Sequence, residues 1–416
     1  MRFLNNLKLS IKLPLMLVTI AMVALTIMGV AAYREAYGLL EREGSARLER
    51  TLNARVAGIE GWQNRVQSDL RSLASNAVTA RALYDFDRGW KQLGDSAAKT
   101  VARAYRDENP NSPDARAKLD YASDATNYSI QHRRYHAGFR TEAAQKGYSD
   151  LYLIDRKGQV VYSINKDPVF ASDLSQGSGP LASLVQEGTR APGAQMFTSE
   201  IQIDDGNAEI YATMPVVSAN GMRLGMVAVR IPATHLGKII GGARGLGETG
   251  QGLIVDHSGG LLNALRHPVG GLGLGSVIDT DAVKDALAGG SGLVEQTGLA
   301  GQSVTAAYMP FSLFGRAYGA VVEQDQTELF APATTLARSM LLHASWLVLA
   351  LAALSAIMAR SVSTPLRQLG ATIRAIAMGE REQQVHGTER RDEVGVIAHA
   401  LDDLRTDLVQ ADAVQQ

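Results

Sequence analysis

Two long stretches of apolar residues stand out from an otherwise mixed sequence. Residues 13–33 contain no charged side chain, and residues 339–359 contain none either, only His343 near their beginning. A helix rises about 1.5 Å per residue, so each stretch can cross a hydrocarbon layer of roughly 30 Å. We therefore predict transmembrane helices over 13–33 and 339–359.

The flanks of the two stretches predict how the chain is oriented. The first apolar run is longer than that of a signal peptide and lacks a small-residue cleavage motif, which favours an uncleaved anchor. Basic residues precede the first span and follow the second, which predicts that both ends (1–12 and 360–416) are cytoplasmic. The region 34–338 should then lie beyond the membrane, in the periplasm of a bacterium. These basic residues are Arg2, Lys8 and Lys12 before the first span, and Arg360, Arg367 and Arg374 after the second.

A heptad pattern follows the first span. Leu52, Ile59, Val66 and Leu73 recur every seven residues, which predicts a long helix that continues outward. This helix either packs on a symmetry mate or another helix as a stalk, or lies on its own domain. Residues 34–147 are assigned to the stalk and a helical insertion, with breaks expected at Gly89, Gly94 and the loop 109–113.

The periodicity then changes to the alternation typical of strands. Five strands, joined by turns at 156–158, 204–207 and 219–221, predict an antiparallel unit, the distal module (148–232). After a helix near 233–243 the scheme repeats more faintly in a proximal module (233–325). The fold class is therefore α+β, two tandem modules behind one long helix. The predicted strands are 150–155, 159–163, 195–203, 208–217 and 223–231, then 252–256, 260–263, 292–297, 303–308 and 318–324.

Two short amphipathic helices are expected after the second span. The first opens at Ser363-Thr364-Pro365, and its apolar residues step by three and four through Ile376; the second repeats this stepping between Ile397 and Leu408. Such stripes cannot be buried by one chain alone, so we expect a parallel four-helix bundle in a homodimer.

Composition and charge narrow the function classes. The 416 residues carry 41 Lys+Arg against 42 Asp+Glu, a net charge of −1, which leaves no basic excess for binding nucleic acid. Cysteine is absent, so a disulfide framework, a thiolate zinc site and a cysteine nucleophile are excluded. No arrangement of Ser, His and Asp and no carboxylate pair indicates catalysis, so we expect neither an enzyme nor a cofactor.

Three local patterns imitate functional motifs. Gly245-x-Gly247-x-x-Gly250 matches a dinucleotide fingerprint, but a strand follows it where that motif needs a helix. His132 and His136 lie four residues apart on a predicted helix; a solvated helix face is favoured over a metal site, because no third ligand is evident. Residues 204–207 are interpreted as a hairpin turn and not as a calcium loop.

Several segments of the external region resemble a known family. YHAGFR (135–140), GYSDLYLIDRKGQVVYSINK (147–166), GLGETGQGLIVD (245–256) and the late Tyr308-Met309-Pro310 resemble the double-Cache sensor of bacterial methyl-accepting chemotaxis receptors. The resemblance implies a PAS-like distal pocket for a small molecule, sometimes an amino acid or amine. The Arg-x-Trp element of amino-acid-binding members is missing, so an amino-acid ligand is not supported. Candidate binding residues, each of which is also compatible with an ordinary core or turn role, are Tyr135, Arg140, Tyr152, Tyr162, Asp173 and Tyr211.

The tail resembles the HAMP linker of transmembrane receptors. That linker has a Pro-Leu start, a Gly-Glu before its connector and an Asp-Glu-x-Gly at its second helix. The matching residues here are Pro365, Gly379, Asp392 and Glu393. The resemblance implies that a displacement of the second span passes into a following effector.

These features lead to one hypothesis and two alternatives. The chain is expected to be a homodimeric receptor of the bacterial inner membrane that senses a periplasmic small molecule and signals through HAMP, reaching a chemotaxis adaptor and kinase through a further C-terminal domain. Only a few residues follow the apolar stripe of the second linker helix. The alternatives are therefore that the chain is the sensory half of a cyclase, kinase or phosphodiesterase, or that it is an output-less receptor that tunes others by dimerisation.

Overall fold

The computed structural model describes residues 9–204, 206–218, 220–378, 380 and 383–415. They form two compact units: Arg42–Leu329, which we call the sensor unit, and the described parts of 1–41 and 330–416, which we call the membrane and linker unit. Helix α2 (Leu9–Ser75) contributes residues to both.

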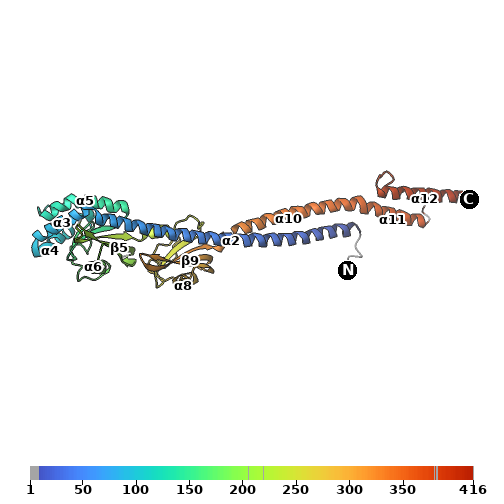
Figure 1. The fold of residues 1–416 in the computed structure, drawn as a ribbon. Coiled ribbons are helices and arrows are strands. Elements are labelled where there is room, and N and C mark those ends of the chain that lie inside the picture. Colours follow the sequence, from blue (N-terminus) through green and yellow to red (C-terminus); the bar gives the residue numbers. More distant parts are fainter. Residues whose placement is uncertain (1–8, 205, 219, 379, 381–382, 416) are drawn as a thin grey trace. The chain divides into compact units, whose positions relative to one another are not determined.

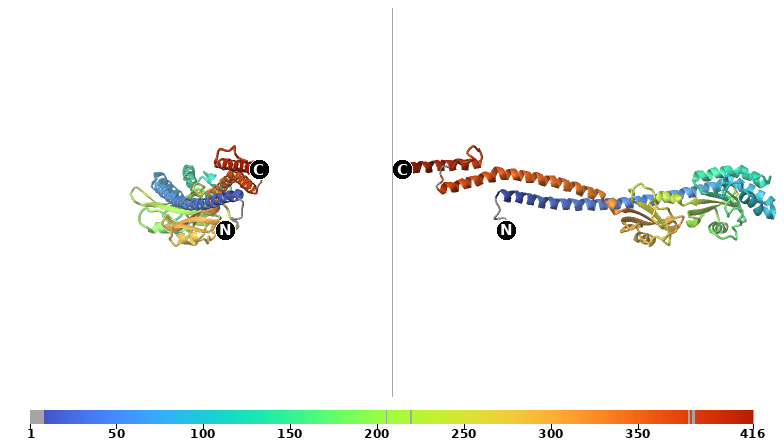
Figure 2. Two further views of the ribbon diagram at one scale, coloured as in Figure 1. Left: turned by 90° about the vertical axis from the view of Figure 1, so that its right-hand side faces the viewer. Right: turned by 180° about the vertical axis from the view of Figure 1, so that it is seen from behind.

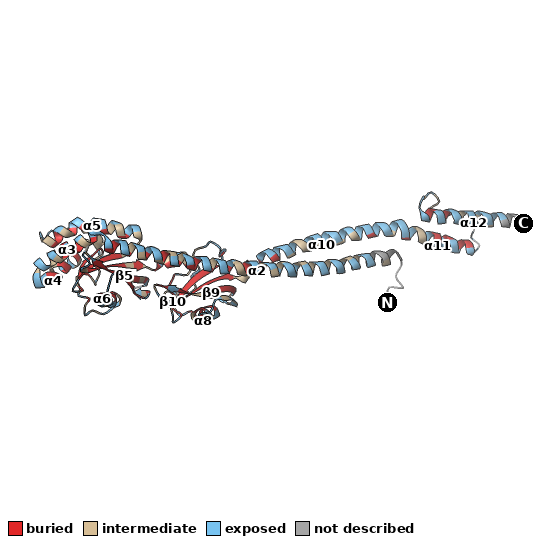
Figure 3. Ribbon diagram, viewed as in Figure 1, coloured by how far each residue is buried: buried red, intermediate tan, exposed pale blue. Residues whose placement is uncertain are grey.

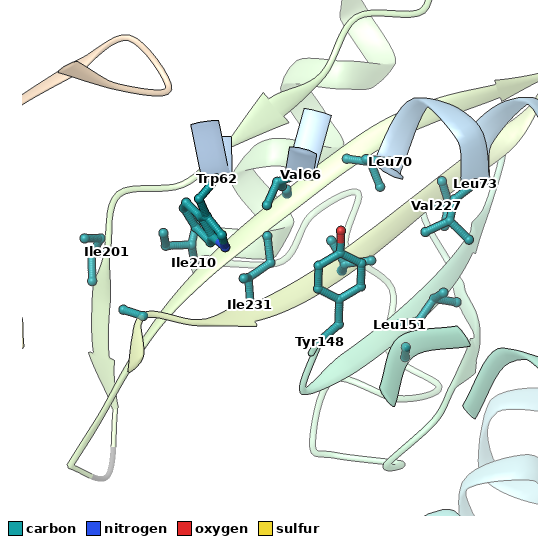
Figure 4. Close-up of a cluster of buried hydrophobic side chains, with 14 of the residues drawn as sticks. Trp62, Val66, Leu70, Leu73, Tyr148, Leu151, Ile201, Ile210, Val227 and Ile231 are labelled. Carbon is teal, nitrogen blue, oxygen red and sulfur yellow. The ribbon is translucent and has the colours of Figure 1, made fainter. Parts of the chain in front are cut away.

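Within the sensor unit, the apolar residues that recur every seven positions along α2 pack against its own domain and are buried there. Leu52, Ile59 and Leu73 are almost fully shielded from solvent. Figure 4 shows the side chains of α2 facing apolar residues of the distal sheet, including Ile210 and Val227. Of the two interpretations left open by the sequence, packing on its own domain is therefore the one that the structure supports.

A helical insertion follows α2, as predicted, but it is not broken at Gly89. Gly89 lies inside α3 (Ala77–Gln92), where a Cβ atom would come within 3.0 Å of the Tyr128 Cα atom. The glycine therefore permits a close approach of α3 and α5, which explains its presence without a break. The remaining helices of the insertion are η1 (Gly94–Ser96), α4 (Ala97–Ala102), the π-turn η2 (Arg103–Asp107), η3 (Pro113–Lys118) and α5 (Asn127–Lys146).

The distal module is an antiparallel sheet in the order β2-β1-β6-β5-β3, with β4 also paired to β5. The predicted strand 195–203 is wrong as a single strand. Ser199 hydrogen-bonds the backbone of Tyr211 with its own N–H and its side chain, and two short strands pair with β5 on either side of it. Helix α6 (Pro180–Arg190) covers one face. The strands are β1 (Asp150–Asp155), β2 (Val160–Ser163), β3 (Phe197–Thr198), β4 (Gln202–Asp204), β5 (Asn207–Val217) and β6 (Arg223–Pro232).

The proximal module is a second antiparallel sheet in the order β7-β10-β9-β8. The expected strand 260–263 is wrong: Gly260 and Leu261 form only isolated bridges, because the Asn263 side chain takes the Ile254 N–H. In Figures 1 and 2 both sheets lie along α2 and α8 lies on the side of its sheet away from α2. The elements are α7 (Thr234–Ile240), β7 (Gln251–Val255), α8 (Asp281–Leu287), β8 (Gly292–Thr297), β9 (Ser303–Leu313), β10 (Arg316–Asp325) and α9 (Gln326–Leu329).

In the membrane and linker unit, the early part of α2 and α10 (Ala331–Met358) are each long and apolar enough to cross a membrane. Figure 3 shows these stretches as mostly exposed, and their exposed residues include Ile20, Ile27 and Leu349. Exposed apolar surface of this length suits a lipid environment.

The linker begins differently from the prediction. The chain does not start a capped helix at Ser363; it continues from α10 through a π-turn, η4 (Ala359–Ser363), into α11 (Thr364–Ala377), and Ser363 makes no side-chain cap. A π-turn accommodates Pro365, which has no N–H to donate within the helix. Helix α12 (Glu393–Gln415) packs on α11 through Leu369, Ile376, Ala398 and Leu401.

Candidate functional site

The strand register of the distal sheet places a row of polar residues on the face covered by α6. Asp150 on β1 lies opposite Arg230 on β6, and Arg230 lies opposite Tyr211 on β5. Directly opposed residues point to the same face, so the three side chains form one row across the central strands. This row is possible only because β6, the last strand of the module, pairs with both β1 and β5.

Three further residues complete this group, which we call the distal cluster. The Tyr152 hydroxyl donates to Asp167 Oδ2 at 2.6 Å. Arg230 Nη1 lies 3.4 Å from Glu209 Oε2 and 3.8 Å from Asp167 Oδ2. The side chains of Arg230, Asp167 and Glu209 are 20%, 10% and 14% exposed, so the cluster is largely shielded but still reached by solvent.

The electrostatics of the distal cluster are those of buried, interacting groups. Burial and the Asp167 carboxylate raise the pKa of Asp150 to about 7. Burial also raises the pKa of Tyr152 and of Tyr211 above the usual range, so both hydroxyls remain protonated donors at neutral pH. One guanidinium therefore faces at least two carboxylates, and the cluster carries an excess of negative charge.

Asp150 has a structural task as well. Its Oδ1 accepts the backbone N–H of Ile164 at 2.8 Å, and its Oδ2 accepts the Ser163 hydroxyl at 3.0 Å. These bonds hold the end of β2 and the segment after it against β1. Asp167, three residues beyond Ile164, is thereby held near Tyr152.

The structure brings two of the six sequence-predicted candidates together and leaves four elsewhere. Tyr152 and Tyr211 belong to the distal cluster. Tyr135 donates to Asp85 Oδ2 at 2.6 Å between α5 and α3, and Arg140 donates to the Ala117 carbonyl at 2.6 Å. Tyr162 points to the opposite face of the sheet, and Asp173 accepts the Ser175 N–H in a turn. The geometry does not join these four residues to the distal cluster or to one another in a single site.

The interpretation of His132 and His136 as a solvated helix face is wrong. Both imidazoles are fully buried where α5 packs on β2, beside Lys166, which is also fully buried. His136 Nε2 donates to the Ala117 carbonyl at 2.8 Å, and Nδ1 lies 2.7 Å from the Tyr162 hydroxyl oxygen, a contact in which the neutral ring accepts the hydroxyl proton. Burial, with the Lys166 charge, lowers the pKa of His136 to about 3 and that of His132 well below its ordinary value.

Sequence reasoning missed Asp150, Asp167, Glu209 and Arg230. One signal was available: Arg230 interrupts the apolar alternation of β6, at a position where Val229 and Ile231 are fully buried. A cation within a buried strand needs partners, and this alone pointed to carboxylates on the neighbouring strands. In the described part of the chain, no group of three or more His, Cys, Asp or Glu residues is placed to hold a metal ion.

In the linker, one of the four sequence-predicted residues, Asp392, takes part in a connected set of bonds. Arg390 pairs with Asp392 at 2.6 Å and donates to the Ser361 carbonyl at 2.9 Å, while Asp392 Oδ1 accepts the Gly395 N–H at 3.0 Å. Pro365 has no N–H for the carbonyl four residues earlier, which is that of Ser361, so Arg390 occupies the place of a missing helix bond. Glu393 starts α12, and Gly379 lies outside the described residues.

Comparisons with known proteins agree with this architecture. Residues 39–333 match the Cache domain family, and residues 357–410 match the HAMP domain family. A protein of Sinorhizobium fredii named probable chemoreceptor y4sI is 23% identical over 277 residues, which are 66% of this chain and 35% of that protein; this chain thus matches about a third of its relative's length.

Solved structures also resemble the chain. A domain of a sensory box/GGDEF family protein from Vibrio parahaemolyticus is 12% identical with a TM-score of 0.43, over 69% of this chain and 98% of that one. The ligand-binding domain of the Campylobacter jejuni chemoreceptor Tlp3, in complex with 4-methylisoleucine, is 13% identical with a TM-score of 0.41, over 70% and 94%. That of the Pseudomonas aeruginosa amino-acid chemoreceptor PctC, in complex with GABA, is 17% identical with a TM-score of 0.37, over 65% and 95%.

Proposed function

Because this chain belongs to the Cache domain family and carries a HAMP domain, we propose that it is a chemoreceptor-type sensor that binds a small molecule at the distal cluster and relays the binding through HAMP. The observation that carries the proposal is the row Asp150–Arg230–Tyr211 with its partners Asp167 and Glu209. Charged side chains at shielded positions are costly for folding, and their concentration on one sheet face favours a role in binding.

The charge balance of the distal cluster suggests the class of ligand. Arg230 is already engaged by Asp167 and Glu209, so an organic acid would have to displace a carboxylate to reach it. A cationic amine instead meets carboxylate oxygens and neutralises the excess charge. We therefore propose an amine ligand in preference to an organic acid.

The relay follows from the order of elements along the chain. We propose that the two apolar helices lie in the bacterial inner membrane, with residues 34–338 in the periplasm and both ends in the cytoplasm. Ligand binding acts only through a difference in affinity between two packings of the sensor, and this difference shifts α10 and α11. A homodimer, and contact with a chemotaxis adaptor and kinase through further sequence, belong to the same proposal.

A thermal-shift screen tests the binding step. The full chain in lipid nanodiscs is screened against primary amines, amino acids, organic acids and purines. An amine present at 100 times its Kd is expected to stabilise the folded chain by about 2.7 kcal/mol. The shift should disappear in Glu209→Gln and Asp167→Asn.

Asp173→Asn is the matched control, because Asp173 is an aspartate of the same module that lies outside the distal cluster. It should retain the full shift. Failure of every compound to raise the melting temperature, or an equal loss of the shift in Asp173→Asn, would contradict the proposed site.

A further inference from the structure

The glycine motif Gly245-x-Gly247-x-x-Gly250 lies in a loop of the proximal module, between α7 and β7, that the proposed function leaves unexplained. Gly245 and Gly247 have φ angles of +83° and +64°, a region that favours glycine. Each also permits a close approach. A Cβ atom would come within 2.7 Å of Thr51 Oγ1 at position 245 and within 2.1 Å of Glu328 Oε1 at position 247. The motif therefore shapes contacts with two other elements, α2 and α9.

The loop 242–250, which we call the strap, is fastened to α2. The guanidinium of Arg55, a buried residue of α2, donates to the carbonyl oxygens of Gly242 and Arg244, the latter at 3.0 Å. Leu246 is fully buried in the main core and anchors the middle of the strap. The first half of the strap is therefore held to α2.

The second half of the strap holds α9. Glu328 Oε1 accepts the Glu248 N–H at 2.8 Å, and Oε2 accepts the Thr249 N–H at 2.9 Å and the Thr249 hydroxyl. Partial burial alone would raise the pKa of Glu328, but the hydrogen bonds of Thr249 and of the Glu248 N–H lower it to about 2, so the carboxylate stays charged. Hydrogen bonds to a charged group are roughly twice as strong as neutral ones, so this carboxylate is a strong fastening.

A second route joins the same elements. Arg47 Nη2, from α2, donates to Gln324 Oε1 at 2.8 Å, and the Gln324 amide N–H donates to the Glu328 carboxylate. Glu328 is thus connected to α2 both by the strap and through Gln324. Helix α2 continues from the first apolar stretch, and α10, which contains the second, begins two residues after the end of α9. The fastenings therefore lie where the chain enters and leaves the sensor.

We propose that the strap is a conformational catch that sets the resting state of the receptor, with Glu328 as the group that opens and closes it. This inference rests on the proposed relay through α10 and α11. A displacement of α10 relative to α2 has to lengthen or break the bonds of Glu328, because α9 leads directly into α10. The closed strap stabilises one of the two packings between which a ligand selects, so opening it shifts the linker without any ligand.

Hydrogen exchange of the full chain in lipid nanodiscs, measured without added ligand, tests the catch. In Glu328→Gln we expect about tenfold faster exchange in the segment 325–331, because charge-assisted hydrogen bonds are lost. We also expect faster exchange in residues 359–368 of the linker, which a merely local role of Glu328 would not produce. Glu295 is an exposed glutamate of β8 in the same module, so Glu295→Gln is the matched control and should leave both segments unchanged.

A second pair of variants tests the catch through sterics instead of charge. In Gly247→Ala the added methyl group collides with Glu328, so the strap should open. Gly301→Ala is its control, because Gly301 also has a positive φ, of +86°, but has open space around it. Gly247→Ala should reproduce the exchange of Glu328→Gln, and Gly301→Ala should not.

Two results would overturn the catch: unchanged exchange of the segment 325–331 in Glu328→Gln, or faster exchange there with an unchanged linker. Failure of the proposed function has a different signature, which is that no compound raises the melting temperature in the thermal-shift screen. Because the exchange measurements are made without ligand, they decide the catch whatever the outcome of that screen.

Discussion

Arg316 Nη1 donates a hydrogen bond of 2.8 Å to the carbonyl oxygen of Thr198, and so joins the β9–β10 hairpin of the proximal module to β3 of the distal module. The next residue, Ser199, accepts the Tyr211 N–H at 3.0 Å and donates its own N–H to the Tyr211 carbonyl at 2.8 Å. Tyr211 belongs to the distal cluster. Two consecutive residues therefore connect the proposed binding site with the strand that leads out of the sensor.

Replacement of Arg316 by alanine should weaken this connection. The side chain is 37% exposed and also lies 3.7 Å from Glu200, so we expect a loss of about 1 kcal/mol in the free energy of unfolding. Ligand affinity at the distal cluster should be retained, while the effect of ligand on the linker should fall. Urea denaturation and hydrogen exchange of the linker measure the two effects, with the exposed turn residue in Arg156→Ala as control. A normal ligand response of the linker in Arg316→Ala would contradict this route.

The buried bases of the insertion predict a loss of stability on acidification. His132 and His136 have lowered pKa values in the folded chain, so the unfolded chain binds protons first as the pH falls below about 6.5. The two histidines should contribute a decline in stability from there towards pH 3, whereas Asp150, whose pKa is raised to about 7, contributes in the opposite sense between pH 7 and about 4. The pKa of Lys166, lowered by burial to about 7, adds the same trend between pH 10.5 and 7. Each proton taken up only by the unfolded chain contributes up to about 1.4 kcal/mol per pH unit.

A substitution isolates the histidine contribution. In His136→Gln the slope of the free energy of unfolding between pH 6.5 and 4 should become shallower, because one titrating group is removed. His257→Gln serves as control, since His257 is exposed on a turn of the proximal module. Chemical denaturation at a series of pH values measures the slope. An unchanged slope in His136→Gln would show that the ring already takes up its proton in the folded state.

Arg390 predicts how the two linker helices are held together. It joins Asp392, before α12, to the Ser361 carbonyl of the π-turn before α11. In Arg390→Ala we expect faster hydrogen exchange in the segment 390–398 and in the residues around Ser361. The adjacent Arg391 is exposed, so Arg391→Ala is a matched control that should leave exchange unchanged. Equal exchange in the two variants would mean that the bonds of Arg390 do not stabilise the junction.

Much of the fold was predictable because it follows from local periodicity. Eight of the ten predicted strand segments correspond to single strands of the two sheets, and the long helix, the two apolar helices and the linker helices are present. The errors occur where a side chain competes with the backbone ladder. Ser199 bonds the backbone of Tyr211 within the predicted strand 195–203, and Asn263 takes the Ile254 N–H beside the predicted strand 260–263.

The site was predictable only in part, since it depends on contacts between distant segments. The tyrosine-rich hairpin pointed to Tyr152, but its neighbour Arg230 is set by the pairing of β1 with β6. Asp167 is set by the bonds of Asp150 to the segment after β2, and local patterns reveal neither contact. The burial of His132 and His136 has the same origin. Their helix is polar in sequence, and they are enclosed by the packing of α5 on β2, on the segment 113–122 and on Tyr105 of η2.

The most direct test of the account asks whether binding at the distal cluster changes the linker. The chain has no cysteine, so a single cysteine introduced at the exposed Ile373 of α11 is unique in each subunit. Disulfide formation between subunits in membrane vesicles is followed with and without the amine identified by thermal shift. The account predicts that the amine changes the rate of crosslinking, that Glu209→Gln removes this change and that Asp173→Asn preserves it. An unaltered rate at saturating amine, or no crosslink between subunits at all, would contradict it.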